Sequence, residues 1–138
     1  MSLYSINLQI GRIQISIYAL NQQLEQKRED LNRLEGVLPK LLNGMEEYHQ
    51  NTRLCTTPEL ASNTWHGQLG TEFQTFRTGE LLSSYQSISR IQLNRTITDL
   101  ENEIETLKRE IADLEDRIPS QQSRLNSLYA QRREELSK

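Results

Sequence analysis

The sequence predicts an all-α protein in which two long helices form an antiparallel helical hairpin, and the hairpin dimerises into a four-helix bundle or coiled coil. Three observations predict this fold. The 138 residues include only six glycines and three prolines, a composition typical of long helices. Apolar residues recur at alternating steps of three and four along both halves of the chain. This periodicity lapses once, between residues 51 and 70.

The first helix is predicted from about residue 4 to residue 50. Lys27 is the only polar residue in its apolar seam, and Pro39 is expected to kink the helix without ending it, since the seam continues in phase across the proline. The seam consists of Ile6, Ile10, Ile13, Ile17, Leu20, Leu24, Leu31, Leu34, Leu38, Leu41, Met45 and Tyr48.

The connection covers residues 51–70, which contain the only tryptophan of the chain, Trp65. Its segment Thr56-Thr57-Pro58-Glu59 predicts a short helical turn, because it combines a hydroxyl cap, a proline for the first turn and an acid. About twenty residues between two long helices favour an antiparallel return of the chain.

The second helix is predicted from about residue 71 to residue 136, with a possible kink at Pro119. Its apolar stripe changes phase between Ile88 and Leu93. The charged residues that flank the stripe are expected to form a solvated face. The stripe consists of Leu81, Tyr85 and Ile88, and then of Leu93, Ile97, Leu100, Ile104, Leu107, Ile111, Leu114, Ile118, Leu125 and Leu128.

The two arms differ in predicted length, at roughly 70 Å and roughly 100 Å for a rise of about 1.5 Å per residue. A fold centred near residue 60 places Ser5 opposite Asp116 and leaves residues 120–138 without an intramolecular partner. Leu125, Leu128 and Tyr129 are therefore expected to be partly exposed and available for binding a partner. Two helices cannot cover both sides of their apolar stripes, so a homodimer or heterodimer is expected.

Composition argues against several classes of partner. The net charge of −3 is spread along the chain, so no basic patch for nucleic acid is expected. No apolar run approaches the ~18 residues of a membrane span, and the N-terminus lacks the pattern of a secretory signal. The single cysteine, Cys55, excludes an intrachain disulfide, and folding in the cytoplasm is the expectation.

No enzyme, cofactor or metal site is predicted. Glu46 and His49 have the Glu-x-x-His spacing of di-iron bundles, but the only other histidine, His66, has no matching glutamate. Cys55 lacks a positioned base or an oxyanion hole and is interpreted as structural. No glycine-rich phosphate loop is present.

The connection carries a family resemblance. Trp65-x-Gly67 between two long helices, with Phe73 eight residues after the tryptophan, resembles the signature of the WXG superfamily of small proteins exported by type VII secretion systems. We expect Trp65 to close the groove between the helices, and Gly67 and Gly70 to leave room for the turn. The alternative is a tryptophan that merely caps a loop.

A second resemblance covers nearly the whole chain. Trp65-His66-Gly67, Phe73, Phe76-Arg77 and Tyr85, followed by the Ile and Leu of residues 97–118, are similar to a longer-armed WXG-like family encoded beside LXG polymorphic toxins. The resemblance implies a helical companion that binds the helical targeting region of a toxin and keeps it competent for export. Phe76 and Tyr85 join Leu125, Leu128 and Tyr129 as candidate partner-binding residues.

One departure from the superfamily affects localisation. Its export signal is Tyr-x-x-x-Asp/Glu, whereas Tyr129 is followed four residues later by Arg133. The chain is therefore expected either to stay in the cytoplasm or to leave through a type VII system with its partner. The alternative function is a homo-oligomeric coiled-coil scaffold or adaptor unrelated to secretion.

Overall fold

The chain is all-α, and the computed structural model describes residues 2–57 and 67–138. None of these residues lies in a strand. The contacts divide the chain into two compact units. Unit 1 contains Met1–Arg33 and Ile104–Lys138, and unit 2 contains Leu34–Glu103.

Two long helical arms are present, as the periodicity predicted. The first arm is α1 (Leu3–Gln50) followed by the 3₁₀ helix η1 (Asn51–Cys55). The second arm begins at Gln68, three residues before the predicted start. It consists of α2 (Gln68–Phe76), the π-helix η2 (Arg77–Leu81), α3 (Leu82–Ser87), the π-helix η3 (Ile88–Leu93) and α4 (Asn94–Leu136).

The predicted continuity across both prolines is confirmed, because Pro39 lies inside α1 and Pro119 lies inside α4. Both prolines are exposed, so the backbone carbonyl that each leaves without an intrahelical donor can reach water. Helix α1 is capped at its start, where the Ser2 hydroxyl accepts a hydrogen bond of 3.2 Å from the Ser5 amide.

The phase change in the second arm coincides with η3. Ile88 and Leu93 are five residues apart, a spacing that turns a side chain away from the seam of an α-helix. A π-helix closes its hydrogen bonds between residues five apart and so keeps these two positions on one face. Both side chains are half-buried, and Ile97, four residues further on, is buried.

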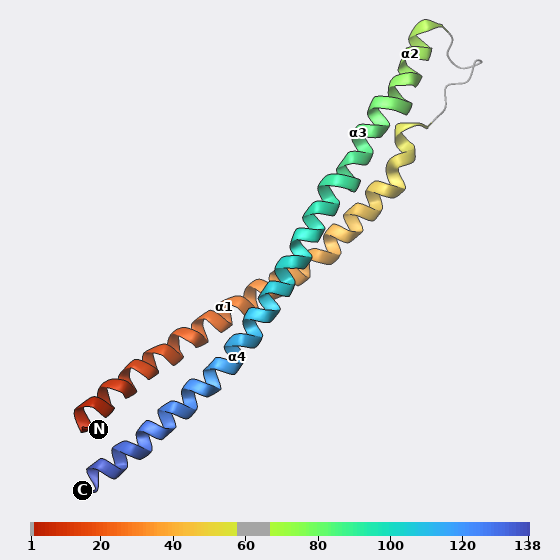
Figure 1. Ribbon diagram of the computed structural model, residues 1–138. Coiled ribbons are helices and arrows are strands. Elements are labelled where there is room, and N and C mark those ends of the chain that lie inside the picture. The colour runs from red at the N-terminus through yellow and green to blue at the C-terminus, as the bar shows by residue number, and fades with distance from the viewer. Residues whose placement is uncertain (1, 58–66) are drawn as a thin grey trace. The chain divides into compact units, whose positions relative to one another are not determined.

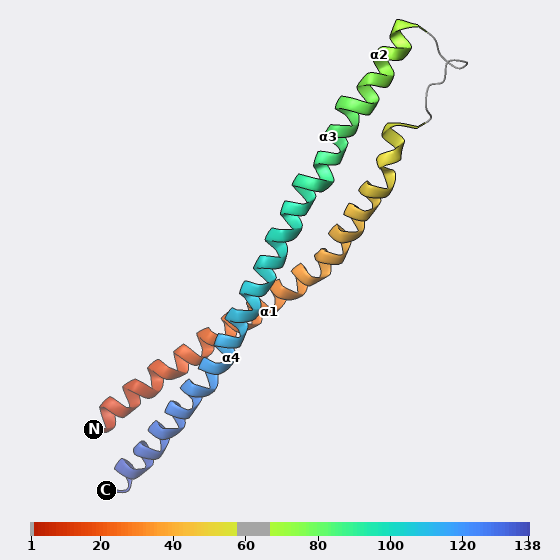
Figure 2. The same cartoon turned by 45° about the vertical axis from the view of Figure 1, so that its right-hand side comes forward.

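In unit 1 the N-terminal part of α1 and the C-terminal part of α4 lie side by side and antiparallel (Figures 1 and 2). Ile6, Ile10 and Ile13 form a buried cluster with Leu125 and Leu128. A second cluster joins Leu20 and Leu24 to Ile111 and Leu114. The seam residues predicted for these segments therefore form the core of the unit.

These clusters correct the prediction for residues 120–138, which was wrong about an intramolecular partner. Leu125 and Leu128 are buried against α1, and Tyr129 is half-buried and accepts a 2.8 Å hydrogen bond from Gln14 Nε2. Because Gln14 meets Tyr129 rather than a residue near 106, the antiparallel pairing is centred several residues beyond residue 60. Two features cause this shift: the first arm ends at Cys55, opposite Arg77, and the π-helices add residues to the second arm.

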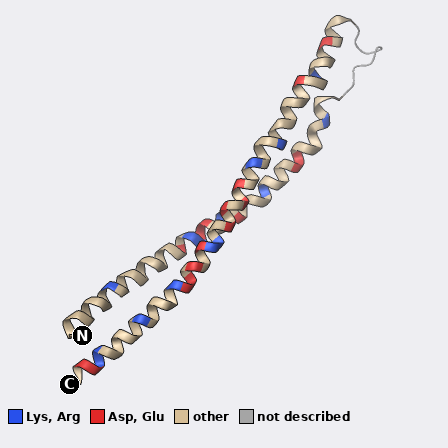
Figure 3. Cartoon of the chain, viewed as in Figure 1, with Lys and Arg blue, Asp and Glu red and all other residues tan. Residues whose placement is uncertain are grey.

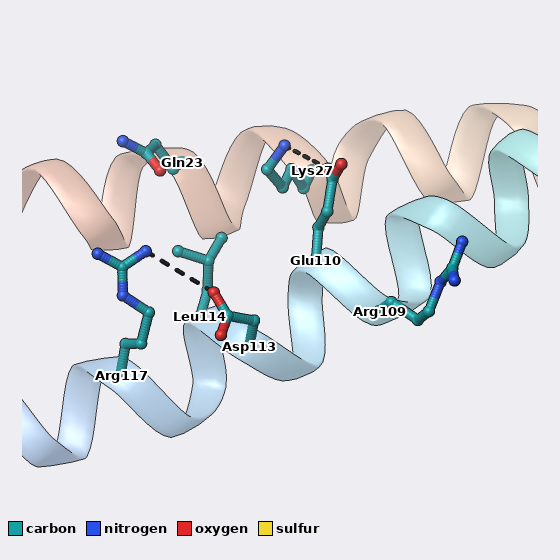
Figure 4. Close-up of a pocket in the computed structure, with 7 residues that line it drawn as sticks. All are labelled: Gln23, Lys27, Arg109, Glu110, Asp113, Leu114 and Arg117. Atoms are coloured by element: carbon teal, nitrogen blue, oxygen red, sulfur yellow. Dashed lines mark hydrogen bonds and ion pairs between the residues drawn. The ribbon is translucent and has the colours of Figure 1, made fainter.

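Ion pairs align the helices of unit 1. Lys27, the polar residue of the seam, extends its ammonium to Glu110, with an Nζ to Oε2 distance of 2.6 Å (Figure 4). Arg28 pairs with Glu115 at 3.0 Å. A polar residue at a seam position favours the register in which it finds a partner, so the Lys27–Glu110 pair favours this alignment of the two helices.

Unit 2 has a thinner core. Cys55 and Ile97 are the apolar side chains that are fully buried among its described residues. The first-arm seam of this unit, Leu34, Leu38, Leu41, Met45 and Tyr48, is only half-buried. Much of the apolar surface of unit 2 therefore remains in contact with solvent.

The structure bears on membranes in one respect. No helix in the described ranges combines the length and the apolar character that a membrane crossing requires.

Candidate interaction surface on α2

Gly67 occupies the start of the second arm in a conformation that favours glycine. Its φ is 99°, and it is the only described residue with a positive φ. Its carbonyl accepts hydrogen bonds of 3.2 Å from both the amide and the hydroxyl of Thr71, which close the first turn of α2. A side chain at this position would strain the backbone that enters the helix.

Arg77 joins the two arms of unit 2. Its Nε donates a 2.9 Å hydrogen bond to the backbone carbonyl of Cys55, the last residue of η1, and its side chain is buried. The guanidinium also lies 5.6 Å from the centre of the Phe73 ring. Because Arg77 rather than Gln68 lies opposite the end of η1, the whole of α2 extends past the end of the first arm (Figure 1).

The extending helix carries apolar side chains that remain exposed. Leu69, Phe73 and Phe76 follow one another at steps of four and three, so they lie on one face, which we name the α2 stripe. Their residues are 71%, 43% and 45% exposed. Large aromatic and aliphatic side chains at this exposure provide the kind of surface that an amphipathic helix of another protein covers.

The face of α2 next to this stripe is buried at Gly70 and Arg77 and half-buried at Gln74. Gly70, Gln74 and Arg77 follow one another at the same steps of four and three. The side-chain oxygen Oε1 of Gln74 is buried and has no hydrogen-bond partner among the residues that the structure describes. A buried acceptor without a donor is unfavourable, so a donor supplied to this face would stabilise it.

Two tyrosines pack where the end of α1 meets α3. The rings of Tyr48 and Tyr85 lie 5.0 Å apart between centroids at an interplanar angle of 30°. Desolvation raises the pKa of Tyr85 above its usual value of 10.0, and the electrostatic influence of Tyr48 and Cys55 raises it further. This packing leaves Tyr85, a candidate partner-binding residue, half-buried in unit 2.

The other predicted site residues are distributed over both units. Trp65 lies outside the described residues, as does half of the turn predicted at Thr56–Glu59. Gly67, Gly70, Phe73 and Phe76 all lie at the start of the second arm. Leu125 and Leu128 belong to the core of unit 1, so they are not available as a surface in this structure. Tyr129 is half-buried beside them, with the Arg132 guanidinium 5.1 Å from its ring centre.

The burial of Arg77 and the partial burial of Gln74 were not predicted. Charged and amide side chains are seldom buried, so residue type gives no signal for either position. Their spacing does give one, because they follow Gly70 by seven and four residues and therefore share its face.

The described residues contain no group of three or more His, Cys, Asp or Glu side chains arranged to hold a metal ion. Glu46 and His49 are both exposed on α1, and Glu46 accepts a 3.3 Å hydrogen bond from Gln50.

An open groove of about 400 Å³ in unit 1 is lined by five charged residues, four of which form two ion pairs, while Arg109 donates a 3.4 Å hydrogen bond to the Thr106 hydroxyl. Lys27 meets Glu110, and Arg117 lies 3.7 Å from Asp113 (Figure 4). Mutual pairing of its acids and bases is typical of a helix surface, and nothing in the groove resembles an arranged acid and base.

Comparison with known proteins adds no assignment: no protein-family model, no curated protein and no solved structure matches this chain.

Proposed function

We propose that this chain is a non-catalytic companion protein of a type VII secretion system that binds the helical targeting region of an LXG toxin. The chain acts as an export companion or is co-secreted with its partner. The observation that carries the binding function is the α2 stripe, which extends past the first arm and exposes Leu69, Phe73 and Phe76. The link to the toxin class depends on the family resemblance of the segment that begins at Trp65.

The thin core of unit 2 supports a binding function. A helical unit that leaves its seam half-buried gains stability when another helix covers that surface. The buried Gln74 oxygen supports the same conclusion, because a partner that covers this face can supply the missing donor. Exposed aromatic side chains are also the usual anchors of protein interfaces.

The binding function can be tested by isothermal titration calorimetry of the full chain with the helical targeting region of the LXG toxin encoded beside it. Phe76→Ser should weaken the affinity at least about tenfold, which corresponds to ~1.4 kcal/mol. Leu136→Ser is a matched control, since Leu136 is also exposed but lies at the end of α4. Equal affinities for the two variants would contradict binding through the α2 stripe.

The alternative function, a homo-oligomeric scaffold unrelated to secretion, predicts a different result. A scaffold would show no binding to the toxin region, and the neighbouring genes would encode neither an LXG toxin nor type VII components. Binding to a helical protein of another class would retain the companion function and reject the toxin as its partner.

A further inference from the structure

A second exposed apolar surface lies on the N-terminal part of α1, in unit 1. Tyr4, Leu8, Gly11, Ile15 and Tyr18 follow one another at steps of four and three and therefore share one face, which we name the outer stripe. The exposed fractions are 78% for Tyr4, 44% for Leu8, 72% for Ile15 and 67% for Tyr18. The outer stripe is separate from the α2 stripe, which lies in unit 2.

The opposite face of the same helix is already occupied. Ile6, Ile10 and Ile13 are buried against Leu125 and Leu128 of α4. At about 100° per residue, the outer stripe points roughly 150° away from this buried face. A helix with apolar side chains on two opposite faces is an inner helix of an assembly, since one neighbour can cover only one of them.

The charge pattern indicates what kind of surface covers the outer stripe. Arg12 is the only charged side chain among the first 24 residues, whereas the rest of unit 1 is rich in both signs (Figure 3). Depletion of charge is typical of the centre of a protein interface. A helix that binds anionic lipid instead carries several Lys or Arg on its polar face, and one arginine does not meet that requirement.

Gly11 has no explanation within its own chain. A Cβ atom added there meets nothing within 4 Å, so no close approach inside the described structure requires glycine. Glycine in the middle of a helix also lowers helix stability relative to alanine. The same open space surrounds Gly36, Gly44 and Gly79, but Gly11 lies in the centre of an exposed apolar stripe, where the missing side chain leaves room for a large side chain of another molecule.

The outer stripe itself supplies that side chain. When two copies of a seam with steps of four and three pack antiparallel, the two kinds of seam position face each other. Leu8 of one copy then lies against Gly11 of the other, and Tyr4 lies against Ile15. Each Leu8–Gly11 pair combines a large residue with glycine, and the contact repeats by two-fold symmetry, so it closes with two copies.

We infer that two copies of this chain dimerise through the outer stripe, with the α1 helices antiparallel and Leu8 of each copy seated on Gly11 of the other. With about 200 Å² for each large side chain, the exposed fractions of Tyr4, Leu8 and Ile15 amount to roughly 400 Å² per copy and roughly 800 Å² for the pair. That area is below the standard size of a stable interface, so the dimer should be weak and form at micromolar rather than nanomolar concentration.

Sedimentation equilibrium of the full chain over a range of concentrations tests this inference. Gly11→Leu should weaken dimerisation at least about tenfold, because two leucines then compete for one space. A double variant that carries both Leu8→Gly and Gly11→Leu exchanges the two residues in every copy. Its dimerisation affinity should return to within about threefold of the wild type. A parallel dimer gives the opposite result for Gly11→Leu, since residue 11 then faces its own equivalent and the new leucines strengthen the contact.

A charge placed on the stripe provides the matched comparison. Ile15→Glu should abolish dimerisation, whereas Asn21→Glu adds the same charge at an exposed position off the stripe and should leave it unchanged. Circular dichroism should show equal helicity for both variants, because neither side chain is in the core.

Three results would overturn the dimer. They are a monomer at about 100 µM, a dimer that tolerates Ile15→Glu, and a monomer that binds vesicles of phosphatidylcholine and phosphatidylglycerol through this stripe. Dimerisation and toxin binding use different surfaces. Phe76→Ser should therefore leave dimerisation unchanged, and Ile15→Glu should not weaken toxin binding.

Discussion

Leu125→Ala should lower the free energy of unfolding by about 2–3 kcal/mol, although the residue lies in a segment that sequence reasoning left without a partner. Leu125 is 5% exposed and belongs to the cluster with Ile6, Ile10 and Ile13. The substitution removes the equivalent of three methylene groups at ~0.8 kcal/mol each, and a cavity adds to this loss. Unit 1 is a pair of helical segments at this point, so partial collapse of the cavity should keep the total below the upper end of the range for buried leucines, about 5 kcal/mol.

The assay is urea unfolding followed by circular dichroism at a protein concentration low enough to keep the chain monomeric. Leu136→Ala provides the control, since Leu136 is 65% exposed and its truncation should cost less than about 0.5 kcal/mol. Removal of residues 120–138 should also increase amide hydrogen exchange in residues 3–13, because those isoleucines lose their cover. Equal unfolding energies for Leu125→Ala and Leu136→Ala would refute the packing of α4 against α1.

Three further predictions concern single features of the fold. Gly67→Ala should destabilise the chain by about 1–2 kcal/mol in urea unfolding, because the φ of 99° is strained for any side chain, and a smaller loss would show that the backbone can relax. Stability should fall as the pH rises above 10, since the unfolded chain releases the Tyr85 proton before the folded chain does; Tyr85→Phe should remove this part of the slope, and an unchanged slope would contradict the raised pKa. A double-mutant cycle on Lys27 and Glu110 should give a coupling energy of about 0.3–1 kcal/mol that falls in high salt, whereas zero coupling would remove this pair from the alignment of the helices.

The periodic parts of the fold could be predicted from sequence because burial follows residue spacing. The seam of α1 from Ile6 to Tyr48 is buried or half-buried throughout, and both prolines lie inside their helices. The change of phase between Ile88 and Leu93 was visible as a five-residue step. Its structural form, a π-helix, depends on which backbone hydrogen bonds are formed and cannot be read from residue types alone.

The alignment of the two arms could not be predicted by counting residues. Length arithmetic from residue 60 assumed a symmetric connection and uniform helical rise, whereas Cys55 pairs with Arg77 and the second arm includes two π-helices. The error placed the helix that extends past its neighbour at the C-terminus, whereas the structure places it at α2. The hydrogen bond from buried Arg77 to the Cys55 carbonyl is a tertiary contact. The periodicity of a single helix does not indicate such a contact.

The two apolar surfaces differ in how they could be anticipated. Phe73 and Phe76 were singled out by family resemblance, and the structure adds that both are exposed. The outer stripe was present in the sequence at the same steps as the core stripe, but only burial separates a stripe that is packed from one that is exposed.

The central claim is that a partner helix covers α2, and hydrogen exchange of the full chain with and without the LXG targeting region tests it most directly. Amides of Gln68–Phe76 lie in a short helix that extends past the first arm, so they should exchange rapidly alone and become protected in the complex. A complex that forms while exchange in Gln68–Phe76 stays unchanged would contradict the claim.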